Sequence, residues 1–295
     1  QYVNQLFQPL IDVTQNFATL QTSTISAGRV FEMMDRDDYE PKQAGSLKEI
    51  ERGDIRFDHV SFSYDGKRDV LKDISFEVKN GQTIAFVGHT GSGKSSIINL
   101  FMRFYEFDRG QILIDGQDIK DYSQEALRKS IGLVLQEPFL YHGTIASNIR
   151  MYHEELTDEE IRQAATFVDV ADFIESLPGG YDHPVTERGS TLSTGQRQLL
   201  AFARTIAAQP KILILDEATA NIDQETEEMI QNSLKKMRQG RTTIAIAHRL
   251  STIQDADCIY VLDKGKIIES GNHDQLIALG GTYKKMYDLQ AGMMK

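Results

Sequence analysis

The chain has 295 residues, 40% of them apolar, and can therefore bury the core of one large domain or two. Its single cysteine, Cys258, excludes a disulfide framework and a cysteine zinc cluster, and fits a reducing cytosolic setting. The formal net charge of -11 argues against broad nucleic-acid binding, which needs a basic face. There is no signal-peptide pattern and no apolar run near the roughly 18 residues of a membrane span. Because the chain starts at Gln1, we expect a piece of a longer protein.

Apolar residues between Leu6 and Met34 recur at steps of four and three, which predicts a helix, with a kink near Pro9. The opposite face carries Gln, Asn, Thr and Ser, and Asp12 is its only charge before Arg29. A freely solvated helix normally carries charges there. The pattern fits a coiled-coil dimerisation helix or the lower end of a membrane-bundle helix. The charged stretch that follows, broken by proline and glycine, is typical of a linker.

Alternating apolar residues from Ile55 to Val78 predict short strands around a turn at Asp65-Gly66. Tyr64 ends the first of these strands. An aromatic side chain at this position can stack on a nucleotide base, and it can equally be a half-buried residue at the end of a strand.

The stretch Thr83 to Leu100 combines a short apolar run, a glycine-rich turn and a second apolar run. It matches G-x-x-x-x-G-K-[ST] at Gly88, Gly93, Lys94 and Ser95, between a predicted strand and a predicted helix. Backbone N–H groups of such a loop, the helix N-terminus and the lysine all attract phosphate, and the serine hydroxyl binds Mg²⁺. The stretch therefore predicts a nucleotide phosphate site.

Further strands are expected near Ile112 to Asp115 and Ile131 to Gln136, followed by a more helical stretch from about Thr144 to Leu177. Thr157 and Glu160 have capping-box spacing, which predicts a helix that starts at Asp158. A glycine- and serine-bearing loop then leads into an apolar helix that ends before Pro210.

Two strongly apolar runs, Lys211 to Glu217 and Thr242 to Ala247, are typical of central strands of a parallel sheet that is buried on both faces. Alternating strands and helices predict a doubly wound α/β fold, and a terminal helix is expected after Gly280-Gly281. Asp216 and Glu217 end the first run, where they can hold Mg²⁺ and orient the attacking water, or simply be solvated acids. His248 ends the second run and, taken alone, is more often structural.

With these motifs in place, the chain resembles the nucleotide-binding domain of an ABC transporter, of the exporter type in which membrane and ATPase domains are fused. The resemblance covers residues from about Gly53 to the C-terminus. It implies a P-loop NTPase (RecA-like) core of parallel strands, with an antiparallel β subdomain and a helical subdomain at about 144–209. Residues 1–34 are then the cytoplasmic end of the last transmembrane helix, 35–52 a linker and 53–295 the ATPase domain. The rest of the membrane domain lies outside this chain, and the expected location is the cytoplasmic face of the cell membrane.

The resemblance also implies roles for individual residues, with ATP and Mg²⁺ as cofactors. Tyr64 resembles the adenine-stacking aromatic, LSTGQ at 192–196 the family signature, and Asn221 to Asp223 the D-loop. The implied catalytic residues are Glu217, His248, Gln136 and Lys94, and the implied metal ligands are Ser95, Gln136 and Asp216. The implied nucleotide-binding residues are Tyr64, Gly88, His89, Thr90, Gly91, Ser92, Gly93, Lys94, Ser95, Ser96, Ser193, Gly195 and Gln196.

One position departs from the family pattern, because Thr194 stands where the signature LSGGQ has its first glycine. A β-branched residue there crowds the backbone and restricts it, whereas Glu217 and the phosphate loop are intact. We therefore expect one subunit of a heterodimeric exporter, paired with a second ABC ATPase subunit and with no nucleic acid. A homodimeric lipid or peptide exporter, a soluble ABC-type ATPase and a regulatory module that binds ATP without hydrolysis are the alternatives.

Overall fold

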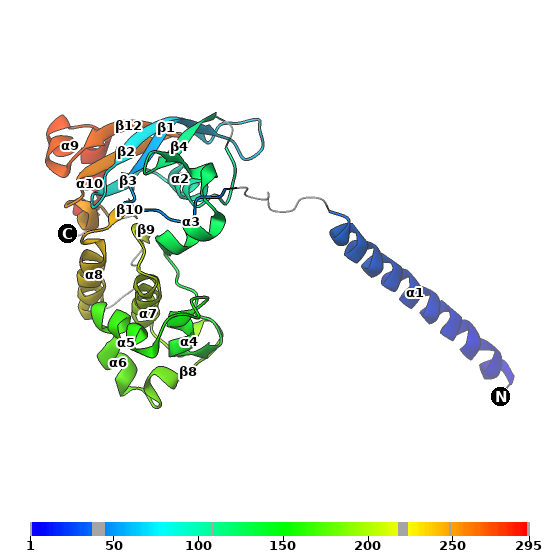
Figure 1. The fold of residues 1–295 in the computed structure, drawn as a ribbon. Helices are drawn as coiled ribbons and strands as arrows, with labels where there is room; N and C mark the ends of the chain where they lie inside the picture. Colours follow the sequence, from blue (N-terminus) through cyan, green and yellow to red (C-terminus); the bar gives the residue numbers. More distant parts are fainter. Residues whose placement is uncertain (1, 37–44, 108, 218–223, 248, 294–295) are drawn as a thin grey trace. The chain divides into compact units, whose positions relative to one another are not determined.

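The computed structural model describes residues 2–36, 45–107, 109–217, 224–247 and 249–293. The chain divides into two compact units, Gln1–Gln43 and Ala44–Lys295 (Figure 1). The described residues of the first unit form the helix α1 (Tyr2–Met34), which runs through Pro9 near its start. Hydroxyls on its polar face donate to carbonyls one turn earlier, for example Thr14 Oγ1 to Leu10 O at 2.8 Å. No helix among the described residues is both long and apolar enough to cross a membrane.

A mostly parallel sheet forms the centre of the second unit, as the doubly wound pattern predicted. Its strand order is β12-β11-β3-β10-β9-β6, and only the edge strand β12 is antiparallel to its neighbour. The bounds are β3 (Thr83–Val87), β6 (Ile131–Val134), β9 (Ile212–Glu217), β10 (Thr242–Ala247), β11 (Cys258–Asp263) and β12 (Lys266–Gly271).

Successive residues of the central strands point to opposite faces of this sheet, and both faces are buried. Along β3, Ala85 and Val87 belong to one hydrophobic cluster, whereas Ile84 and Phe86 belong to the other. The same alternation holds in β9 and β10. Burial on both faces explains why these strands have continuous apolar sequences rather than alternating ones.

An antiparallel sheet in the order β2-β1-β4-β5 packs over one of the two clusters, together with helices α2 and α3. The stacked rings of Phe57 and Phe76, with centroids 4.4 Å apart, join β1 and β2 on its inner side. The bounds are β1 (Ile55–Phe62), β2 (Leu71–Val78), β4 (Arg109–Ile114), β5 (Gln117–Asp118), α2 (Lys94–Phe101) and α3 (Gln124–Ser130).

The region expected to form the helical subdomain, about 144–209, contains four α-helices, which Figure 1 shows gathered at the end opposite to β1, β2 and β4. Thr157 and Glu160 form the predicted capping box, and the helix starts at Asp158. A short ribbon of β7 (Gly143–Thr144) and β8 (Pro184–Val185) joins this group. The helices are α4 (Ile145–Arg150), α5 (Asp158–Phe167), α6 (Ala171–Ser176) and α7 (Thr194–Ala207).

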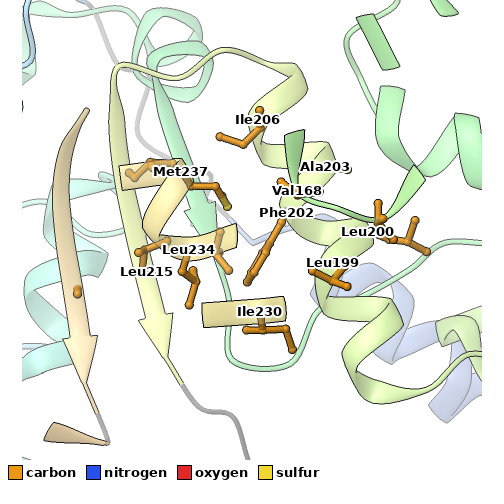
Figure 2. Close-up of a cluster of buried hydrophobic side chains, with 14 of the residues drawn as sticks. Val168, Leu199, Leu200, Phe202, Ala203, Ile206, Leu215, Ile230, Leu234 and Met237 are labelled. Carbon is orange, nitrogen blue, oxygen red and sulfur yellow. The ribbon is translucent and has the colours of Figure 1, made fainter. Parts of the chain in front are cut away.

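Helix α7 connects the helical group to the parallel sheet through an apolar core. In Figure 2, Phe202 of α7 points toward Leu215 of β9 and toward Ile230 and Leu234 of α8 (Gln224–Arg238). Phe202 and Ile230 are fully buried. Each such side chain contributes roughly 1.5–3 kcal/mol to folding, so this contact fixes α7 against the sheet. Helices α9 (His273–Leu279) and α10 (Thr282–Met293) complete the unit.

The second unit begins at Ala44, nine residues before the boundary expected at Gly53. The reason is that the later part of the expected linker packs on the domain. Ile50 is fully buried, and Leu47 forms a parallel bridge with Tyr122.

Candidate nucleotide-binding and catalytic site

The loop between β3 and α2 has the backbone conformation of an anion-binding turn. Gly88, Gly91 and Gly93 have φ values of 152°, 79° and 110°, a range that side chains rarely adopt. A Cβ on Gly88 would lie 2.3 Å from the carbonyl oxygen of Leu262, whereas a Cβ on Gly91 would meet nothing within 4 Å. Gly88 therefore serves close packing, and Gly91 faces open space.

The open face of the loop is the side on which a phosphate would sit. His89, Thr90, Gly91 and Ser95 are exposed there, while Ser92, Gly93, Lys94 and Ser96 are buried. Ser92 Oγ is buried and has no hydrogen-bond partner among the described residues. The exposed glycine and the N-terminus of α2 together suit a bound anion.

Lys94 supplies the positive charge of the loop. It is 7% exposed, and its Nζ donates to the carbonyl oxygens of Gly88 at 2.7 Å and His89 at 3.2 Å. Burial lowers the pKa of the Lys94 ammonium, and the carboxylate of Asp216 partly offsets this by raising it. A phosphate next to Lys94 would stabilise the buried charge further.

The parallel sheet brings the remaining candidates to the same edge as the loop. In β9 and β10, Glu217 pairs with Ala247, the residue before His248, and in β6 and β9, Val134 pairs with Leu215. Strand β10 lies between β3 and β9 and is parallel to both, so Asp216 and Glu217 end at the same edge of the sheet as the loop that follows β3. Gln136 lies two residues beyond β6 and is exposed, because the strand ends at Val134 rather than at Gln136 as expected.

A magnesium ion fits this edge. No group of three or more His, Cys, Asp or Glu side chains that could hold a metal occurs in the part of the chain that the structure describes. Mg²⁺ needs no such cage, since one or two protein ligands, water and substrate phosphates complete its shell. The exposed hydroxyl of Ser95 and the half-buried carboxylate of Asp216 are suitable ligands.

Tyr64 is held next to the loop helix by its hydroxyl. The Tyr64 OH lies 3.0 Å from Ser96 Oγ, and Asn99 Nδ2 donates to it at 3.1 Å. Phe62 and Tyr105 pack edge-on against the ring, which is 47% exposed. The exposed part of the ring is therefore available for stacking, at a fixed place beside the loop.

The signature residues lie at the start of α7. Ser193 caps this helix: its Oγ accepts from the Gln196 backbone, and Gln196 Oε1 accepts from the Ser193 backbone. Thr194 is exposed as the first helical residue, and its Oγ1 accepts from Arg197 at 3.1 Å. The helix therefore accommodates Thr194 at its first position. Within the described residues, no hydrogen bond or ion pair joins Ser193, Gly195 or Gln196 to the loop between β3 and α2.

Some predicted residues lie outside the described part of the chain, namely His248 and Asn221 to Asp223, and only the backbone of Glu217 is described. Conversely, Gly265 supports the site without having been predicted. Its N–H donates to Ser92 O at 3.0 Å, and a Cβ at this position would lie 2.1 Å from Val70 O. The turn sequence Asp263-Lys264-Gly265 predicts a hairpin at this point, but the neighbour of that hairpin is set by the tertiary fold.

Known proteins and a family model resemble this chain over most of its length. The family model described as ABC transporter matches residues 71–220. The putative ABC transporter ATP-binding protein exp8 of Streptococcus pneumoniae is 71% identical over 294 residues, which cover 100% of this chain and 50% of that protein. The probable multidrug resistance ABC transporter ATP-binding/permease protein YheH of Bacillus subtilis is 52% identical over 99% of this chain and 43% of that protein.

Among solved structures, a bacterial Atm1-family ABC exporter with ATP bound superimposes with a TM-score of 0.81 and 41% identity, over 98% of this chain and 51% of that chain. The chain thus spans about half the length of the relatives that it matches. The chain belongs to the ABC transporter family and carries its ATPase domain, which binds ATP with Mg²⁺.

Proposed function

We propose that this chain is the ATP-hydrolysing part of an exporter that moves a drug, lipid or other amphipathic molecule out of the cell. The observation that carries the proposal is the convergence of the phosphate loop, Asp216 and Glu217 at one edge of the parallel sheet. In the proposed reaction, Lys94 and the loop hold the phosphates, Ser95 and Asp216 hold Mg²⁺, and Glu217 orients water for attack on the terminal phosphate.

The proposed location is the cytoplasmic face of the cell membrane, with α1 as the cytoplasmic end of the last membrane helix. The fused ATP-binding/permease architecture named for YheH supports this reading. A second support is the polar face of α1, where Thr14, Thr19, Thr22, Thr24 and Ser26 all donate their hydroxyls to the helix's own carbonyls. Hydroxyl groups whose hydrogen bonds are made within the helix itself suit surroundings with little water. The coiled-coil reading of this helix is the alternative.

The active site is proposed to form between two subunits. In this arrangement the signature of one subunit, at the N-terminus of α7, meets the ATP bound to the loop of the other. Thr194 is exposed at that helix end, so its methyl group would crowd an approaching nucleotide. We therefore favour a heterodimer, in which the loop, Glu217 and His248 of this chain work with an unaltered signature of the partner.

Two experiments test this proposal. Glu217→Gln should retain ATP binding but reduce turnover by about 10²–10⁴-fold, as expected for loss of a water-orienting base. Unchanged hydrolysis would remove Glu217 from this role. Mixing the chain with the ABC subunit encoded beside it should raise ATPase activity, whereas full activity of this chain alone with no gain on mixing would favour the homodimeric lipid or peptide exporter.

A soluble ABC-type ATPase outside transport is the second candidate. The acidic charge of the chain and the apolar, weakly charged N-terminal helix both count against it. Measuring whether the longer protein that contains this chain co-purifies with membranes after a salt wash separates the two, since only the exporter is embedded.

A further inference from the structure

Residues 45–54, here called the docking segment, attach the start of the second unit to its sheets. The backbone N–H groups of Ser46 and Leu47 both donate to Asp121 O at 2.9 Å, and Ser123 N donates to Leu47 O at 2.9 Å. Ile50, in the middle of the segment, is fully buried. The segment is therefore part of the folded domain rather than a free connection.

A single carboxylate holds the last four residues of the docking segment. Asp115 accepts hydrogen bonds from the backbone N–H groups of Glu51 and Arg52 through Oδ2 at 2.9 Å and of Gly53 and Asp54 through Oδ1 at 2.8 Å. Hydrogen bonds to a charged acceptor are about twice as strong as neutral ones. Four of them on one side chain make Asp115 the principal attachment of this segment.

The turn between β4 and β5 sets the direction of Asp115. Its two loop residues, Asp115 and Gly116, have φ values of 53° and 81°, as a two-residue hairpin turn of this type requires. The backbone of Asp115 also donates to Asp54 O at 2.8 Å. The carboxylate is therefore held in place by its own turn before it binds the docking segment.

The docking segment also contacts the start of β9, the strand whose other end carries Asp216. Lys211 Nζ donates to Glu51 O at 2.8 Å. A Cβ on Gly53 would lie 2.9 Å from Ile212 Cγ1, so the backbone of Gly53 packs closely against the Ile212 side chain. The segment is thus attached to both sheets of the core.

The docking segment and the helical subdomain, in contrast, line a common cavity of about 550 Å³. Its lining includes Lys48 and Glu49 of the docking segment, and His153, Leu156 and Ala208. The hydrogen bonds of the described docking segment run to Asn80, Asp115, Asp121, Ser123 and Lys211, all in the core. None of them reaches α4, α5, α6 or α7.

We propose that Asp115 is a positioning residue for energy coupling: it fastens the docking segment to the core, so that the segment bearing α1 follows the core and not the helical subdomain during the ATP cycle. This inference rests on the proposed exporter function. It predicts that loss of the Asp115 charge disconnects α1 from ATP hydrolysis without stopping hydrolysis itself.

The test compares Asp115→Asn with Asp118→Asn in the full-length transporter that contains this chain, held in lipid nanodiscs. Asp118 is the matched control, because it lies in the same hairpin and its side chain, among the described residues, accepts a hydrogen bond only from the backbone of Lys120. The side-chain amide keeps the shape of Asp115 but loses its charge. We expect hydrogen exchange of the amides of residues 51–54 to accelerate at least about tenfold in Asp115→Asn and to stay unchanged in the control.

The second measurement is hydrogen exchange along α1 with and without ATP, Mg²⁺ and vanadate. Wild type and Asp118→Asn should show a nucleotide-dependent change in α1, and Asp115→Asn should lose most of it while its ATPase rate stays close to that of the control. Three results for Asp115→Asn would overturn the proposal: a retained response of α1 to nucleotide, unchanged exchange at residues 51–54, or a parallel loss of ATPase activity and thermal stability. A wild type that hydrolyses ATP with no response in α1 would also overturn it. A wild type without ATPase activity would instead refute the proposed function, and the exchange at 51–54 would still report on the attachment.

Discussion

Two glycines of the phosphate loop should respond in opposite ways to the same added methyl group. In Gly88→Ala the new Cβ would lie 2.3 Å from Leu262 O and 2.8 Å from Ser92 Oγ, so the loop must move away from β11. In Gly91→Ala the new Cβ would meet nothing within 4 Å. Both residues have positive φ, so both variants also carry backbone strain.

These contacts set the expected magnitudes. Left-handed backbone strain costs about 1–2 kcal/mol for alanine, and this is the whole expected cost of Gly91→Ala. Overpacking adds about 1–3 kcal/mol, so Gly88→Ala should lower the free energy of unfolding by about 2–5 kcal/mol in total. In the folded protein, ATP binding should instead be weakened more by Gly91→Ala than by Gly88→Ala. The Gly91 methyl group enters the space assigned to phosphate and displaces at least one charge-assisted hydrogen bond, which weakens binding about tenfold or more.

The assay is urea unfolding without nucleotide, followed by titration with a fluorescent ATP analogue. Gly240→Ala is the control, because Gly240 has a φ of 71° and an equally open Cβ position but lies in the turn before β10. It should match Gly91→Ala in stability and wild type in ATP affinity. A folded Gly91→Ala protein that binds ATP as tightly as wild type would refute the placement of phosphate on the open face of the loop.

Three further predictions concern side chains around the site. Tyr64→Ala should weaken ATP binding by about 1–3 kcal/mol, because stacking on the base is lost. Tyr64→Phe loses only the hydroxyl contacts to Ser96 and Asn99 and should weaken binding less. Equal ATP affinity of Tyr64→Ala and wild type in the same titration would contradict the stacking role. Arg204→Met should lower the free energy of unfolding by about 2–5 kcal/mol. The reason is that Arg204 donates hydrogen bonds to the backbone carbonyls of Phe139 and Asn148 and to Asn148 Oδ1. A midpoint of urea unfolding equal to that of wild type would contradict this prediction. Burial raises the pKa of Tyr283 from its usual value near 10 to about 12. The contribution of Tyr283 to stability is therefore complete below pH 10 and is lost as pH rises toward 12. Over that pH range the unfolding midpoint of Tyr283→Phe should fall less than that of wild type, and equal slopes of midpoint against pH would contradict this role of Tyr283.

The sequence alone was sufficient for features that depend on neighbours along the chain. The phosphate loop, the capping box at Thr157 and the strands ending at Glu217 and Ala247 were predicted because periodicity and turn chemistry act over a few residues. The nucleotide-binding role followed from the same local order, since a strand, a glycine turn and a helix place Lys94 and Ser95 by themselves.

Only the tertiary structure decided which distant segments meet. It placed Gly265 against Ser92, Asn99 and Tyr105 against Tyr64, and the carboxylate of Asp115 against four N–H groups more than 60 residues away in sequence. It also placed Ile50, from the expected linker, in the core of the second unit, and the burial of Ile50 depends on partners that no local pattern reveals. Strand order and side-chain packing are set by contacts between residues remote in sequence, and a period of two or 3.6 residues carries no information about them.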